Sequence, residues 1–125
     1  MKNAICWFEI PVVDFERAKT FYNTILDIEL QEMQMGEERM AIFPSEKDGV
    51  GGAIIESKYE NYQPSTKGLK IYFEATDDIN DSLAKVEKAG GKIHIPKTLI
   101  SEETGHFGSF IDTEGNLLSF YSSPK

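Results

Sequence analysis

A pattern of alternating residues near the start of the chain returns 63 residues later, and this repeat constrains the fold more than any other feature. The first copy is Trp7-Phe8-Glu9-Ile10-Pro11-Val12-Val13-Asp14, and the second is Lys70-Ile71-Tyr72-Phe73-Glu74-Ala75-Thr76-Asp77 (70 − 7 = 63). In each copy one alternate set is apolar and the other carries larger polar or amphipathic groups, which is typical of a strand with one packed face. Asp14 and Asp77 then end the strands and are suited to cap helices. The chain is therefore expected to contain two similar units.

Each unit is expected to hold one strand, one helix and three further strands. In the first unit, residues 3–57, the apolar spacing predicts a helix over 15–27 and later strands over 30–35, 39–43 and 53–56. In the second unit, residues 69–123, it predicts a strand over 70–76, a helix over 79–89 that stops at Gly90-Gly91, and strands over 92–95, 107–111 and 117–121. Residues 58–68 are polar without an apolar period and are expected to be the linker, in which Tyr59 and Tyr62 either pack on the domain or line a ligand rim.

Composition limits the classes of protein and partner. A chain of 125 residues with 40 % hydrophobic residues fits one domain, residues 1–125. The net charge of −8 argues against a nucleic-acid or anionic-membrane partner. No apolar segment is long enough to span a bilayer and no signal-peptide pattern opens the chain, so a cytoplasmic location is expected. The single cysteine, Cys6, cannot form an internal disulfide and is expected on the packed side of its strand.

Four segments together resemble a known family. They are Phe8-Glu9-Ile10-Pro11-Val12-x-Asp14-x-Glu16-Arg17-Ala18-x-x-Phe21-Tyr22, Gly51-Gly52-Ala53, Lys88-Ala89-Gly90-Gly91-Lys92 and Asp112-Thr113-Glu114-Gly115-Asn116. The chain resembles the vicinal-oxygen-chelate superfamily of glyoxalases, bleomycin-resistance proteins and extradiol dioxygenases, and in particular the predicted enzymes related to lactoylglutathione lyase. The resemblance implies an α+β fold in which two βαβββ units form an open eight-stranded cup with a helix covering each sheet. It also implies a homodimer, to which the open sheet edges would contribute.

The resemblance further implies four metal-ligand positions, on the first and last strand of each unit. In this sequence they fall on Trp7, Glu56, Lys70 and Ser119, since Glu56 and Ser119 share the offset of 63 (119 − 56). Only Glu56 is a suitable ligand, whereas a divalent metal is usually held by three or more N, O or S donors. We therefore expect no metal site and no cofactor.

The same cup face is expected to carry other chemistry. Glu9, Glu56 and Glu74 alternate onto it with Lys70, where they would act as a general base or form structural ion pairs; Glu56 is expected to approach Lys70. His106, between Gly105 and Gly108, is either an acid–base group or an ordinary residue at a strand end. His94 is expected to face solvent.

Two functions follow from these residues. The first is binding of a small organic molecule without a metal, with apolar walls from Trp7, Tyr72, Phe107 and Tyr121, a polar anchor from Lys70, and Glu74 and Ser119 on the same face. The alternative is a lyase or isomerase of the glyoxalase type. It would be metal-dependent or would use Glu9, Glu56 or His106 in acid–base catalysis.

Overall fold

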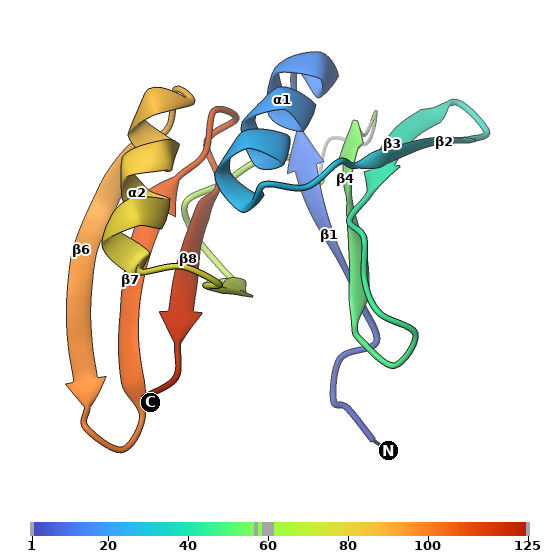
Figure 1. The fold of residues 1–125 in the computed structure, drawn as a ribbon. Helices are drawn as coiled ribbons and strands as arrows, with labels where there is room; N and C mark the ends of the chain where they lie inside the picture. Colours follow the sequence, from blue (N-terminus) through green and yellow to red (C-terminus); the bar gives the residue numbers. More distant parts are fainter. Residues whose placement is uncertain (1, 57, 59–61, 125) are drawn as a thin grey trace.

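The computed structural model describes residues 2–56, 58 and 62–124, and these fold into the two expected βαβββ units (Figure 1). Unit one consists of β1 (Trp7–Val12), α1 (Phe15–Leu26), β2 (Gln31–Met35), β3 (Glu38–Ile42) and β4 (Gly51–Glu56). Unit two consists of β5 (Tyr72–Glu74), α2 (Ile79–Lys88), β6 (Lys92–Ser101), β7 (Gly105–Ile111) and β8 (Leu117–Ser122). The predicted order of elements is confirmed.

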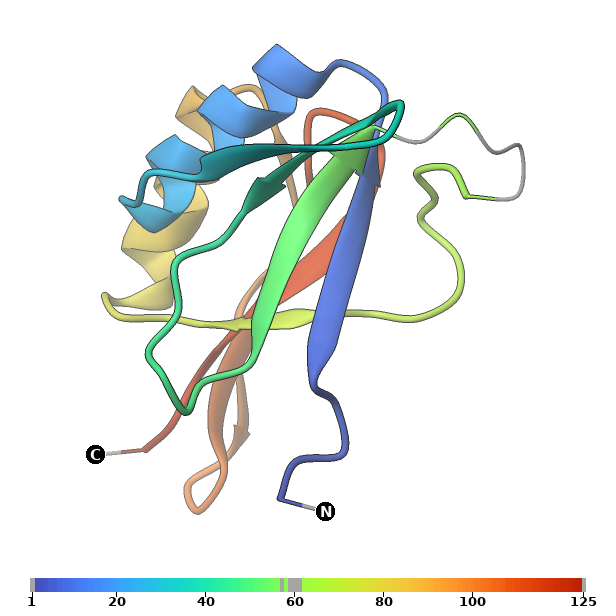
Figure 2. The ribbon, with the colours of Figure 1, turned by 90° about the vertical axis from the view of Figure 1, so that its right-hand side faces the viewer.

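The eight strands form two separate four-stranded sheets rather than one continuous ladder. Sheet I has the order β1-β4-β3-β2, and sheet II has the order β5-β8-β7-β6. In both sheets the first and last strands of the unit pair in parallel, and the other pairs are antiparallel. Figure 2 shows β1 and β4 side by side in sheet I, with residues 62–68 of the linker beyond β1. The cup is therefore divided between two sheets.

Each sheet packs one face on its own helix, and the two helices contact each other (Figure 1). The resulting core takes residues from both helices and both sheets, and aromatic rings cross the boundary between the units. The ring centroids of Phe43 and Phe73 are 5.8 Å apart, and those of Phe8 and Phe73 are 6.2 Å apart. We call the helix-bearing face of each sheet its inner face and the opposite face its outer face. Because the inner faces share one core, the outer faces point away from it.

The ends of the elements follow the predicted signals with some shifts. The Asp14 side chain caps α1 by accepting from the Arg17 backbone N–H at 3.1 Å. The second cap is Asp78, not Asp77, and accepts from the Asn80 N–H at 2.8 Å. Cys6 is exposed, contrary to expectation, because β1 begins only at the following residue.

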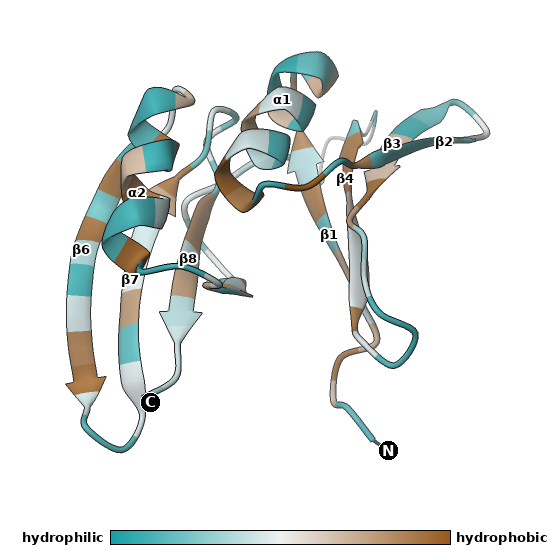
Figure 3. Ribbon diagram, viewed as in Figure 1, coloured by the Kyte–Doolittle hydropathy of each residue, from teal (hydrophilic) through white to brown (hydrophobic). Residues whose placement is uncertain are grey.

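β6 is longer than predicted and continues through Pro96. β6 is an edge strand, so a proline without an N–H interrupts no hydrogen bond to another strand on its free side. On the other side, the pairing with β7 shifts between Ile95 and Thr98, around the proline. Figure 3 shows hydrophobic and hydrophilic bands alternating along the first part of this strand, as in a strand with one packed face. No helix in the described ranges is long and apolar enough to cross a membrane.

Candidate functional site

Strand pairing decides which predicted site residues share a face. In sheet I, Glu9 pairs with Ala53 and Val12 pairs with Glu56. Paired residues point to the same side of a sheet, and neighbours along a strand alternate. Glu9 therefore lies on the outer face with Ala53, whereas Glu56 lies on the inner side with Val12. The expectation that Glu56 shares the face of Trp7 and Glu9 is wrong.

The error comes from assuming one offset for the whole repeat. The first strands are related by 63 residues, as Glu9 and Tyr72 show (72 − 9), but their partners Ala53 and Ser119 are related by 66 (119 − 53). Ala53, rather than Glu56, is thus the counterpart of Ser119. The expected approach of Glu56 to Lys70 is also not seen, since Glu56 lies beside the far end of β1.

Sheet II carries its predicted residues on one outer face. Tyr72 pairs with Ser119, and Tyr121 pairs with both Glu74 and Phe107. Lys70 precedes β5 and places its ammonium group 5.7 Å from the centre of the Tyr72 ring, within reach of a cation–π interaction. The shared placement agrees with the alternation in the sequence, and the binding roles of these side chains stay predictions.

Two adjacent hollows lie on the outer side of β5. The seam pocket, of about 460 Å³, lies where β1 approaches residues 69–71, just before β5, and the start of β8, and Trp7, Glu9 and Lys70 contribute to its lining together with Leu69 and Leu117. The tyrosine pocket, of about 570 Å³, is lined by Tyr72, Glu74, Ala75, Tyr121 and Ser123. Both volumes are in the range of small-molecule sites. The contact of Lys70 with Tyr72 connects the two pockets.

Two neighbours hold the Glu9 carboxylate in the seam pocket. It accepts from the Trp7 indole N–H at 3.1 Å and from the Tyr62 hydroxyl at 2.8 Å. Burial, followed by this hydrogen bond to Glu9, raises the pKa of Tyr62 well above its ordinary value. Tyr62 also packs against a buried cluster of Met40, Ala53 and Ile55 on the outer face of sheet I. The linker tyrosine therefore packs on its own domain, while Tyr59 lies outside the described residues.

Two predicted ligand-binding residues have their polar atoms occupied. Ser119 is fully buried, and its hydroxyl is 2.7 Å from that of Ser109. The Tyr121 hydroxyl donates to the Thr104 carbonyl at 2.5 Å. Ser119 thus supports the outer face from below, and Tyr121 presents a ring held in a fixed position.

His106 lies away from both pockets. It pairs with Ser122 and alternates with Phe107, which places it on the inner side of sheet II. There it lines a hollow with Asp78, Ile79 and Lys97. Glu9, Glu56 and His106, the three predicted catalytic residues, are therefore not brought together. His94 is exposed, as expected.

The donors do not fit a metal site of the kind that the resemblance implies. Among the residues that the structure describes, no group of three or more His, Cys, Asp or Glu side chains is placed to hold a metal ion. Of the four implied positions, Trp7 and Lys70 supply no suitable donor, Ser119 is bonded to Ser109, and Glu56 lies on the other side of sheet I.

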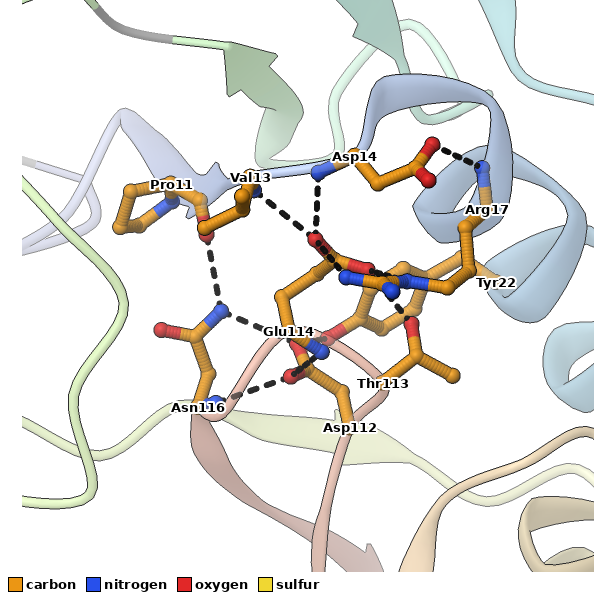
Figure 4. A network of polar contacts seen from close by, with 9 residues as sticks. All are labelled: Pro11, Val13, Asp14, Arg17, Tyr22, Asp112, Thr113, Glu114 and Asn116. Carbon is orange, nitrogen blue, oxygen red and sulfur yellow. Dashed lines mark hydrogen bonds and ion pairs between the residues drawn. The ribbon is translucent and has the colours of Figure 1, made fainter.

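The turn Asp112–Asn116 has a second role that its sequence did not predict, and Figure 4 shows it. The fully buried Glu114 carboxylate accepts from the backbone N–H groups of Val13 and Asp14 at 2.8 and 2.7 Å and pairs with the Arg17 guanidinium at 2.7 Å. The Asn116 side chain donates to the Pro11 carbonyl at 2.9 Å. This turn of unit two thereby holds the end of β1, the strand that carries Trp7 and Glu9. The sequence signal for this role is four polar residues in a five-residue turn, more than the turn itself requires.

Comparison with known proteins identifies the family. The model of the Glyoxalase/Bleomycin resistance protein/Dioxygenase superfamily matches residues 4–120. The chain belongs to this superfamily. A glyoxylase-like domain-containing protein of Didymella fabae is 30 % identical over 123 residues, which are 96 % of this chain and 94 % of that protein.

Several solved structures share the fold. TnmS3, an antibiotic-binding protein from Streptomyces sp. CB03234, gives a TM-score of 0.70 at 21 % identity over 97 % of this chain and 96 % of that one. A glyoxalase-related enzyme from Fulvimarina pelagi gives a TM-score of 0.71 at 13 % identity over 98 % and 89 %. At these identities the likeness shows the superfamily fold and no particular activity.

Proposed function

We propose that this superfamily member binds a small organic molecule on the outer side of β5, across the seam and tyrosine pockets, without a metal. The observation that carries the proposal is the convergence of Trp7, Glu9 and Lys70 from two units at one pocket. The Trp7 and Tyr72 rings supply apolar walls, and the Lys70 ammonium supplies an anchor for an anionic or carbonyl group on the ligand. Glu9 and Glu74 accept hydrogen bonds, and Phe107 extends the apolar face.

The comparisons support this class of function. TnmS3, which shares the fold, is described as binding an antibiotic. The proposal needs no convergence of three catalytic residues, and the geometry brings none together. The outer pockets combine aromatic rings with a few charged groups, which is typical of a site that binds a small molecule.

We also propose that the protein is a homodimer whose partner covers the outer pockets. Trp7 and Tyr72 are 42 % and 51 % exposed and Leu69 is fully exposed, and all three lie on the outer side around β5. Exposed apolar groups gathered in this way are typical of a surface that another molecule covers. A second copy would turn each shallow pocket into an enclosed cup.

The test of binding uses Trp7, the only tryptophan in the chain, as a reporter within the site. Bleomycin is the first probe, and its titration should change Trp7 emission in a saturable way. Tyr72→Ala should weaken the affinity about tenfold through loss of one aromatic wall, whereas Leu99→Ala, on β6, should leave it unchanged. If the parent, Tyr72→Ala and Leu99→Ala bound bleomycin, and any other compound that binds, with equal affinity, the ligand would lie elsewhere.

Glyoxalase-type chemistry is the second candidate, because Glu9 is a carboxylate oriented by two donors at the wall of a pocket. It would act as the general base, alone among the three predicted catalytic residues. Formation of lactoylglutathione by the purified protein, abolished in Glu9→Gln with the fold intact, would support this candidate. Unchanged turnover in that variant would remove Glu9 from the chemistry.

A further inference from the structure

A third hollow, on the inner side of the fold, belongs to neither outer pocket. This inner cleft, of about 570 Å³, lies between the two sheets, below the end of α1 and beside the start of α2. It is bordered by residues 25–28, 43–44 and 73–77, by Val50, and by Ser82 and Lys85 of α2. Its lining comes from both units, so its shape depends on how they pack.

The walls of the inner cleft are aromatic. Phe8, Phe43, Phe73 and Phe120 all line it, and their rings form one connected cluster with centroid separations of 5.3 Å for Phe8 and Phe43 and 6.3 Å for Phe73 and Phe120. Each ring is held by its neighbours in the core. A ligand would therefore meet a preformed apolar surface, and the faces of its aromatic rings also attract cations.

The mouth of the cleft is acidic. Among the described residues that line it, the acidic ones are Asp27, Glu74 and Asp77, and Lys85 is the basic one. Glu74 points to the outer face with its partner Tyr121, so the charges at the mouth itself are those of Asp27, Asp77 and Lys85, a net charge of −1 (1 − 2). The Lys85 ammonium is 3.7 Å from the Asp77 carboxylate, and both side chains are well exposed, so the pair is weak and open to exchange.

The helix ends favour the same sign of ligand charge. α1 points its C-terminal end at the cleft, and its last turn contains no basic residue. The negative end of its dipole is therefore left without a countercharge. The N-terminal end of α2, whose positive dipole would favour an anion, already carries Asp78 as its cap and Asp81 in its first turn.

We propose that the inner cleft binds a small organic cation: an ammonium group at the acidic mouth, carried by an aromatic or aliphatic body that lies against the phenylalanines. The ammonium group replaces Lys85 as the partner of Asp77 and lies near Asp27 at the end of α1. The nearly buried Ser82 hydroxyl, on the wall formed by α2, is placed to accept from it. This site is separate from the proposed function and stands without it.

The test compares three ligands of one shape and different charge: 2-phenylethylammonium, 2-phenylethanol and 3-phenylpropionate. Amide chemical shifts of the full chain should move with the ammonium compound at Asp27, Ile28, Thr76, Asp77 and Ser82. The ammonium compound should bind about tenfold more tightly than the alcohol, and the carboxylate more weakly than both. No saturable shift below about 10 mM for any of the three would overturn the proposal.

Variants then separate charge from folding. Asp27 lies in the left-handed region (φ 54°), which asparagine also tolerates, and Asp77 caps no helix. The double variant Asp27→Asn, Asp77→Asn should thus fold normally and lose about tenfold in affinity for 2-phenylethylammonium. Glu102→Gln, in the β6–β7 turn, removes a charge away from the cleft and should bind like the parent.

Trp7→Phe alters the outer pockets alone and should leave the inner-cleft shifts in place. Shifts confined to residues of the outer pockets, or equal affinity for the ammonium compound and the alcohol, would contradict the proposal. If the parent protein showed no saturable change of Trp7 emission with bleomycin while the inner-cleft shifts were present, the result would count against the proposed function and not against this site.

Discussion

Glu114 joins the two units through one buried carboxylate. Its two oxygens accept from Val13 and Asp14 N–H groups, from the Arg17 guanidinium and from the Thr113 hydroxyl. These donors come mostly from unit one, about a hundred residues away in the chain. The contact therefore fixes where α1 begins and how β1 lies against unit two.

Glu114→Gln should destabilise the fold by about 2–4 kcal/mol, because an amide replaces one acceptor oxygen with a donor that faces other donors. Denaturant unfolding of both proteins measures this difference. Glu32→Gln is the matched control: Glu32 pairs with Lys19 at 2.8 Å in an exposed position, where screening leaves the pair little to contribute. An equal effect of the two substitutions would mean that the Glu114 network is not a special contact.

Acid should weaken the Glu114 contribution. Burial by itself raises the pKa of Glu114, but the hydrogen bonds from Arg17, Asp14, Thr113 and Val13 lower it by more, so the net pKa lies below the ordinary value. A group with a lowered pKa stabilises the fold above its unfolded pKa, about 4.3 for Glu, and loses that contribution as the pH falls through the folded pKa. The stability difference between the parent and Glu114→Gln should hold from about pH 6 to 8 and shrink below about pH 4. A difference that grows in acid would reverse this assignment.

At the scale of the elements, two glycines with positive φ allow the cost of backbone strain to be measured apart from the cost of a steric clash. Gly105 (φ +112°) opens β7, and an added Cβ would come within 2.1 Å of the Ser122 carbonyl oxygen, whereas Gly115 (φ +101°) has nothing within 4 Å. Gly115→Ala should cost about 1–2 kcal/mol for the backbone conformation alone.

Gly105→Ala should cost about 1–3 kcal/mol more than Gly115→Ala, because the β7–β8 ladder must also shift. Thermal unfolding of the two variants gives the comparison. Equal melting temperatures would show that the hairpin absorbs the extra atom.

Periodicity predicts elements well and their pairing poorly. The apolar spacing of Phe15, Ala18, Tyr22 and Ile25 specifies one helix face, so α1 differs from its prediction by one residue. The face of Glu56 depends instead on the register between β1 and β4, which the loop before β4 sets. Three residues of difference between the units moved Glu56 to the inner side of sheet I.

Contacts between residues far apart in the sequence could not be predicted for the same reason. The link from Glu114 to Arg17 and the inner cleft arise where the units meet, and the hydrogen bond from Tyr62 to Glu9 joins the linker to unit one. Local patterns carry no information on that meeting. The place of Trp7, Lys70 and Tyr72 outside the core could be predicted because it follows from alternation, whatever the arrangement of the two sheets.

For the whole molecule, the arrangement of the sheets predicts how copies associate. Two surfaces compete: the outer side around β5, where Leu69 is fully exposed, and the free edge of sheet II, where Leu99 on β6 is 52 % exposed. Charge at the centre of an apolar interface is strongly unfavourable, while the same charge elsewhere on the surface is tolerated. One substitution at each position can therefore tell the two modes of association apart.

The parent should run as a dimer of about 28.2 kDa (2 × 14.1) in light scattering across a range of concentrations. Leu69→Glu should shift it to the 14.1 kDa monomer and weaken binding in the outer pockets together with association, because the proposed partner covers those pockets. Leu99→Glu should leave the dimer intact. The opposite pattern would assign association to the β6 edge, and a parent that stays at 14.1 kDa at every concentration would leave each outer pocket as an open, single-chain site.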